Sequence, residues 1–208
     1  MHTASTSALD PKLLGHISEL NRQLLELLSA TARGQPTGVI TPVVRALRAQ
    51  WEQLSPEALR RLAACPYLLL DLSVDELSQT LDAGDAIHEP ALARPPAITP
   101  VAPSLSTELQ WRALLTAWHF AQTNPLAARI SLGLAPADSA RLATVPLPQL
   151  EAAVTRRNWR LRLRWEDRVD VWQQLLQAAT ESQSRRLRQL QLRGLQLLAG
   201  QLLPGTRV

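Results

Sequence analysis

The stretch that decides the fold is NPLAARISLGLAPADSARLATVPLPQLEAAVTRRNWRLRLRW, residues 124–165, in which residues that start or end helices recur at short intervals. Asn124 followed by Pro125 is a typical helix start, because the amide oxygen can accept a free backbone N–H and proline at the first position loses no hydrogen bond. Gly133 is expected to end this helix. A second helix begins at Pro136, and two further prolines precede a third. We therefore predict a helix-turn-helix-like trio of short helices.

The last seven residues of this stretch alternate strictly between apolar and basic side chains. A period of two predicts a short strand over 159–165 with one buried face and one exposed cationic face. Exposed arginines at this spacing can contact phosphates, although outward arginines also keep a strand edge soluble or pair with nearby carboxylates. The candidate DNA-binding residues are Arg156, Arg157, Arg160, Arg162 and Arg164.

The same stretch resembles the FlhD subunit of the bacterial flagellar transcription activator. The resemblance is carried by Leu132 and Gly133, by ARLA at 140–143, by LPQL at 147–150, and by the closing pair at 164–165. The first predicted helix, from residue 12, is also similar to that family's first helix, whereas residues 34–107 do not match. The resemblance implies a regulator of transcription, or a subunit of one, that works through assembly with a second protein.

Leucine-rich stripes indicate that helices dominate the rest of the chain. A helix is expected to start at Asp10 and Pro11 and to present one apolar face. This face either closes the core of the monomer or binds another protein or a second copy. The candidate partner-binding residues are Leu13, Ile17, Leu20, Leu24, Trp159 and Trp165.

The predicted fold is mainly α, an irregular multi-helix bundle with at most one short strand or hairpin near 159–165. We expect an N-terminal helical region over 1–83, a proline-rich linker or surface loop over 84–105, and the FlhD-like region with C-terminal helices over 106–208. The two helical regions are either separate or share one core. No internal repeat is evident.

Charge is unevenly distributed along the chain. Residues 1–155 hold 11 basic and 14 acidic groups, whereas residues 156–208 hold 11 basic and four acidic groups. All basic residues except Lys12 are arginine, which suits bidentate pairing with phosphates or carboxylates. A GC-rich genome also raises the arginine content, but it does not explain why the C-terminal quarter lacks matching acidic residues, so the charge asymmetry is the better clue to function.

The sequence shows no motif that would indicate an enzyme, a cofactor or a metal site. The four histidines are scattered, the eight glycines form no phosphate-binding loop, and Cys65 is the only cysteine. No segment has the length and composition of a signal peptide or a membrane span, so we expect a cytoplasmic protein that makes no membrane contact. Two hypotheses follow: a regulator that contacts DNA through a basic surface, or a helical adaptor or chaperone-like protein that binds only protein.

Overall fold

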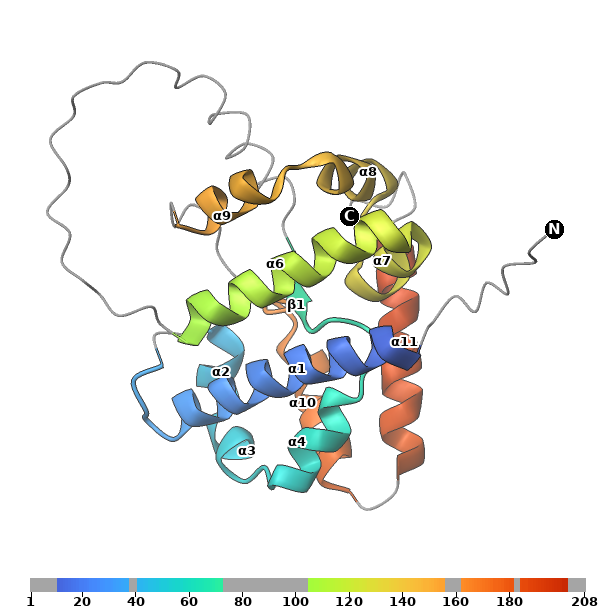
Figure 1. Ribbon diagram of the computed structural model, residues 1–208. Helices are drawn as coiled ribbons and strands as arrows, with labels where there is room; N and C mark the ends of the chain where they lie inside the picture. Colours follow the sequence, from blue (N-terminus) through green and yellow to red (C-terminus); the bar gives the residue numbers. More distant parts are fainter. Residues whose placement is uncertain (1–10, 38–40, 73–104, 156–161, 182–183, 202–208) are drawn as a thin grey trace, which may run out of the picture.

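The computed structural model describes residues 11–37, 41–72, 105–155, 162–181 and 184–201 (Figure 1). These residues are mainly helical, as predicted, with one antiparallel pair of two-residue strands. The first group of elements is α1 (Pro11–Ala32), α2 (Pro42–Ala46), α3 (Arg48–Glu52), α4 (Pro56–Ala63) and β1 (Leu70–Asp71). The second group is α6 (Leu105–Thr123), α7 (Pro125–Leu132), α8 (Pro136–Thr144), α9 (Leu147–Thr155), β2 (Arg162–Leu163), α10 (Val169–Thr180) and α11 (Ser184–Gln201).

The two long helices α1 and α6 form the centre of the molecule. They lie side by side and run in opposite directions, with α2–α4 on the side of α1 and α7–α9 on the side of α6 (Figure 1). Helix α10 packs against α2–α4, and α11 packs against α10 and α7. The buried side chains of both groups belong to one continuous cluster, so the two helical regions share a core.

The predicted trio of short helices is present as α7, α8 and α9. The Asn124 side chain accepts a hydrogen bond from the backbone N–H of Ala127 at 3.0 Å, and Pro125 occupies the first turn. Gly133 ends α7 in the left-handed conformation, with a φ of 68°. Local signals therefore set both ends of α7, as the sequence predicts.

The segment from Thr41 to Trp51 forms two short helices. Thr41 caps α2, and its side chain accepts a hydrogen bond from Val44 N–H at 3.2 Å. At Leu47 the φ of −114° departs from helical geometry, and the chain divides into the short helices α2 and α3.

The two strands join the halves of the chain. Leu70 lies opposite Leu163 and Asp71 opposite Arg162 in an antiparallel pair. Strand β2 therefore lies inside the predicted segment, although residues 159–161 fall outside the described part. The segment that includes residues 70 and 71 supplies its partner.

Helices α4 and α8 share a short sequence pattern. Each begins at a proline, contains Arg-Leu-Ala at 61–63 or 141–143, and is followed by a proline at 66 or 146.

Candidate functional site

Arg164, a predicted DNA contact, lies in the interior with only 4% of its surface exposed. Its Nε donates to the carbonyl oxygen of Leu68 at 2.8 Å, and its Nη2 donates to those of Leu70 at 3.0 Å and Leu132 at 2.9 Å. The guanidinium group thus joins the β1 segment to the end of α7. The prediction that Arg164 faces solvent is wrong, because the strand ends at Leu163 and the alternation ends with it.

No carboxylate forms an ion pair with Arg164 among the described residues. Burial lowers the pKa of its guanidinium group from the ordinary value, while the nearby charge of Asp71 opposes this change. Gly133 gives the group room: a side-chain Cβ at that position would lie 2.8 Å from Nη1 of Arg164. Arg164 therefore has a structural role, and the three carbonyl groups compensate for its burial.

The other candidate arginines have different locations. Arg162 is exposed on β2. Arg156, Arg157 and Arg160 lie outside the described residues, as does Trp159. The described structure therefore does not bring these candidate DNA contacts together at one surface.

The predicted partner-binding leucines on α1 face the protein's own core. Leu13, Ile17, Leu20 and Leu24 are all buried, so the apolar stripe of α1 closes the monomer and does not form a docking surface. Trp165 is also buried, and its ring packs edge-on against Tyr67 with 5.6 Å between ring centroids. The prediction that these residues bind a partner is wrong in this structure because their side chains are not accessible.

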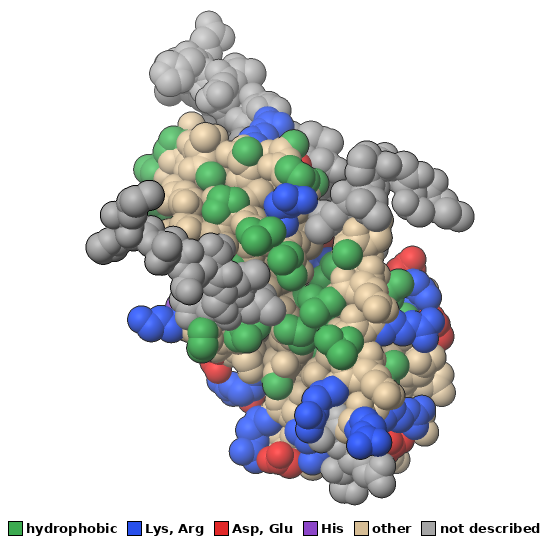
Figure 2. All heavy atoms as spheres, turned by 90° about the vertical axis from the view of Figure 1, so that its right-hand side faces the viewer, with side chains coloured by type: hydrophobic (Ala, Val, Ile, Leu, Met, Phe, Trp, Pro, Cys, Tyr) green, Lys and Arg blue, Asp and Glu red, His purple; other side chains and the backbone are tan. Residues whose placement is uncertain are grey.

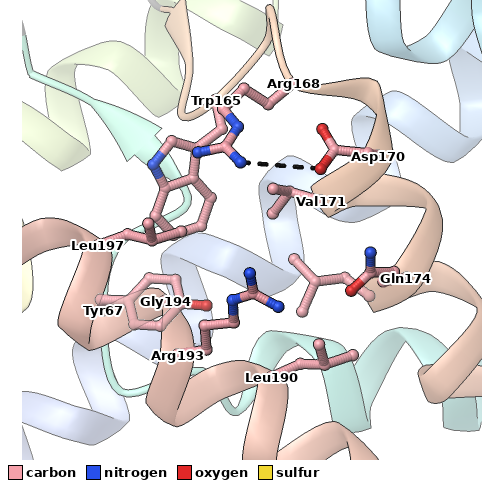
Figure 3. A pocket seen from close by; sticks show the side chains of 11 residues that line it. Tyr67, Trp165, Arg168, Asp170, Val171, Gln174, Leu190, Arg193, Gly194 and Leu197 are labelled. Carbon is pink, nitrogen blue, oxygen red and sulfur yellow. Dashed lines mark ion pairs between the residues drawn. The ribbon is translucent and has the colours of Figure 1, made fainter. Parts of the chain in front are cut away.

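A narrow pocket lies between α10 and α11, with Tyr67 and Trp165 in its wall (Figure 3). The pocket has a volume of about 30 Å³, which is room for only one or two water molecules. Arg168 forms an ion pair with Asp170 at 3.8 Å beside it. The pocket is too small for a typical metabolite.

Close packing on α11 explains the narrow shape of this pocket. A Cβ at Gly194 would lie 2.2 Å from the Tyr67 hydroxyl oxygen, so glycine is needed for the helix to approach this ring. The hydroxyl group is buried and meets no partner with hydrogen-bond geometry among the described residues, although the nearby Cys65 thiol interacts with it electrostatically. Burial is the main reason that the pKa of Tyr67 is raised, and the phenol is therefore neutral.

The outer side of α11 carries the most exposed large hydrophobic residue of the described structure. Leu192 has 60% of its surface exposed, compared with 43% for Leu126 on α7 and 38% for Leu147 on α9. Viewed from the side of α11, the molecule shows hydrophobic side chains spread from its upper part to its middle, and its basic side chains are most numerous in the lower part (Figure 2). We define the outer flank as Arg185, Arg188, Leu192, Leu195 and Ala199, of which all but the half-buried Leu195 are exposed.

The spacing of the outer flank is regular. Its members follow one another at intervals of three and four residues, which places them on a single stripe of the helix. A neighbouring side of α11 packs into the core through Leu187, Gln191 and Leu198. Leu195 also packs partly against the core, so Leu192 and Ala199 are the exposed apolar positions of the outer flank.

All charged residues of α11 are basic. Residues 184–201 contain four arginines and no acidic residue. Arg186 pairs with Glu181 at 2.7 Å, whereas Arg185 and Arg193 form no ion pair with a described residue. The surface of α11 is therefore both apolar and basic.

Neither a metal site nor a membrane-spanning helix is found in the described ranges. No group of three or more histidine, cysteine, aspartate or glutamate side chains there could hold a metal ion. None of the described helices is both long enough and apolar enough to cross a bilayer. A hollow of about 390 Å³ between α1 and α6 is lined partly by Glu108 and Arg112, which pair with each other.

No protein-family model matches the chain, and comparisons with curated proteins and with solved structures find no match. The resemblance to FlhD therefore stays a prediction, and the evidence on function comes from the sequence and the structure of this chain.

The sequence locates an excess of basic residues in the C-terminal quarter, but no residue of the last helix was selected as a site residue. The signal that could have identified the outer flank is the interval of three and four residues from Arg185 to Ala199, because it is separate from the stripe that contains Leu187 and Leu198. Deciding which of the two stripes is buried requires the tertiary structure.

Proposed function

We propose that this protein acts by binding another protein, as a helical adaptor or as the assembling subunit of a regulator. The exposure of Leu192 within the regular stripe of α11 carries the proposal. An exposed leucine alone is common, but a stripe of apolar positions on a helix flank is typical of a surface that packs against a second helix.

Direct contact with DNA is the second candidate function. The net charge of +7 over residues 156–208 and the exposure of Arg162 favour it. Its support is weaker because Arg164 is engaged in the interior and three other candidate arginines lie outside the described residues.

Capture of the tagged full-length protein from its native lysate, with and without nuclease, tests these functions. Leu192→Asp is the variant, and Leu126→Asp on α7 is the matched control, because both change an exposed leucine to a charge. We expect a nuclease-resistant protein partner that is lost with Leu192→Asp and kept with Leu126→Asp.

Two results would count against protein binding through α11. Loss of all bound material on nuclease treatment would favour the DNA-binding function. Equal capture by the wild type and Leu192→Asp would show that the outer flank is not the binding surface.

A further inference from the structure

The intervals along the outer flank indicate what kind of element covers it. Arg185, Arg188, Leu192, Leu195 and Ala199 are separated by three, four, three and four residues. This is the spacing of a helix that packs lengthwise against another helix, with the two side-chain stripes interlocked. A partner that binds through an irregular surface, or that inserts a single side chain, would not require residues at these intervals.

The composition of the stripe indicates the chemistry of that second helix. Its first two positions are arginines, and its remaining positions are apolar. A matching helix therefore places carboxylates opposite Arg185 and Arg188 and apolar side chains opposite Leu192 and Leu195. Exposed Arg185 has no carboxylate partner among the described residues.

A second copy of α11 does not meet these requirements. A parallel copy would place arginine against arginine, and an antiparallel copy would place Arg185 against Ala199. Because α11 contains no acidic residue, neither arrangement supplies a carboxylate. Burial of arginine in such a contact is unfavourable.

Nucleic acid would interact favourably with only the basic half of the outer flank. Phosphates can accept hydrogen bonds from Arg185 and Arg188, but they gain nothing from the exposed surface of Leu192. A polypeptide that presents both carboxylates and apolar side chains matches all positions.

We propose that the outer flank of α11 binds an acidic amphipathic helix of a partner protein. This inference rests on the proposed function and adds the chemical nature of the partner. The apolar positions supply most of the affinity, while the arginines set the position of the partner helix and the preference for an acidic sequence.

The test measures fluorescence anisotropy of a labelled helical peptide of about three heptads mixed with the full-length protein. The peptide carries leucines at positions matching the apolar part of the flank and glutamates at positions matching the arginines. A charge-reversed peptide has lysines in place of these glutamates, and a third peptide has the same composition as the first in scrambled order.

We expect the acidic peptide to bind and the other two to bind at least tenfold more weakly. The double variant Arg185→Glu/Arg188→Glu should reverse this preference and bind the lysine peptide better than the glutamate peptide. Arg45→Glu on α2, which changes an exposed arginine elsewhere, should leave the preference unchanged. Binding of the acidic peptide should weaken as salt is raised, because the arginine contacts are screened.

Three results would overturn the inference. Equal binding of the acidic and scrambled peptides would show that the outer flank does not recognise the helical spacing of the peptide's side chains. An unchanged preference in the double variant would show that the arginines do not face the partner. Dimers of the wild type that dissociate with Leu192→Asp in sedimentation would identify a second copy as the occupant.

The peptide test also separates the two proposals. If no peptide binds, but Leu192→Asp still removes the protein captured from lysate, the acidic-helix inference fails and the proposed function stands. If Leu192→Asp changes neither measurement, both proposals fail.

Discussion

At the scale of single residues, Arg164 shows how a charged side chain can serve the fold. Its three acceptors are the carbonyl oxygens of Leu68, Leu70 and Leu132, and no carboxylate forms an ion pair with it among the described residues. Replacement by leucine removes the burial cost of the charge but leaves three carbonyl groups without this donor. We expect Arg164→Leu to lower the free energy of unfolding, measured by denaturant titration, by about 1–3 kcal/mol for each carbonyl group that is left without a partner.

Arg162→Leu is the matched control, because it removes a charge two residues away on the same segment. Arg162 is exposed, so we expect a change of no more than about 1 kcal/mol. If Arg164→Leu lowers the free energy of unfolding no more than this control does, the hydrogen bonds of Arg164 contribute little to stability.

The buried side chains of Cys65 and Tyr67 make the stability of the fold decrease at alkaline pH. Burial raises the pKa of the Cys65 thiol from its ordinary value of 9.0 to about 12, and it also raises the pKa of Tyr67. Both groups thus ionise more readily in the unfolded chain than in the folded protein. The stability that these groups contribute is complete below pH 9.0 and is lost as the pH rises toward about 12.

Denaturant titrations at a series of pH values check this expectation. The free energy of unfolding should fall above pH 9.0, and the slope should be smaller in a Cys65→Ala/Tyr67→Phe variant. If the free energy of unfolding falls equally steeply with pH in that variant, other groups cause the loss of stability at alkaline pH.

At the scale of elements, Asn21 connects α1 to the segment between α4 and β1. Its amide nitrogen donates to the carbonyl oxygens of Ala63 at 3.3 Å and Tyr67 at 2.9 Å, and its oxygen accepts from Leu69 N–H at 2.8 Å. Because Asn21 is fully buried, water cannot replace these bonds without rearrangement.

We expect Asn21→Ala to destabilise the fold by about 2–3 kcal/mol in denaturant titrations. Hydrogen exchange at Leu69 should also accelerate more than exchange within α7, which lies outside this connection. The control is Gln23→Ala, a substitution at a half-buried position of the same helix, and it should have a small effect on stability. Equal effects of the two changes would contradict the role assigned to Asn21.

The elements also show what the sequence can and cannot predict. The start and end of α7 depend on Asn124, Pro125 and Gly133, which lie within or next to the helix, and they were predicted correctly. The environment of Arg164 depends on carbonyl groups at Leu68 and Leu70, which are 96 and 94 residues away in the sequence. Periodicity carries no information about such distant acceptors, so the exposed-face prediction failed there.

The same reasoning applies to the two leucine-rich helices. The stripe of α1 and the outer flank of α11 are similar as sequence patterns, yet the first is covered by α4 and α6 and the second is left exposed. The mainly α fold could be predicted because it depends on local patterns. The candidate site could not, because it depends on which helix the rest of the chain covers.

At the scale of the whole molecule, the two halves provide a rigid support for the C-terminal helices. Trp172 of α10 packs against Trp51 with 5.8 Å between ring centroids, and its Nε1 donates to the carbonyl oxygen of Arg164 at 2.9 Å. Helix α11 reaches the same core through Leu187 and Leu198. This arrangement fixes one side of α11 and leaves the outer flank open to a partner.

The most direct test of the account is hydrogen–deuterium exchange of the full-length protein, alone and with the protein partner that it captures. We predict slower exchange over residues 184–201 in the complex, and loss of this protection with Leu192→Asp but not with Leu126→Asp. Protection confined to α6–α9, or no change over α11, would contradict the assignment of the outer flank as the binding surface.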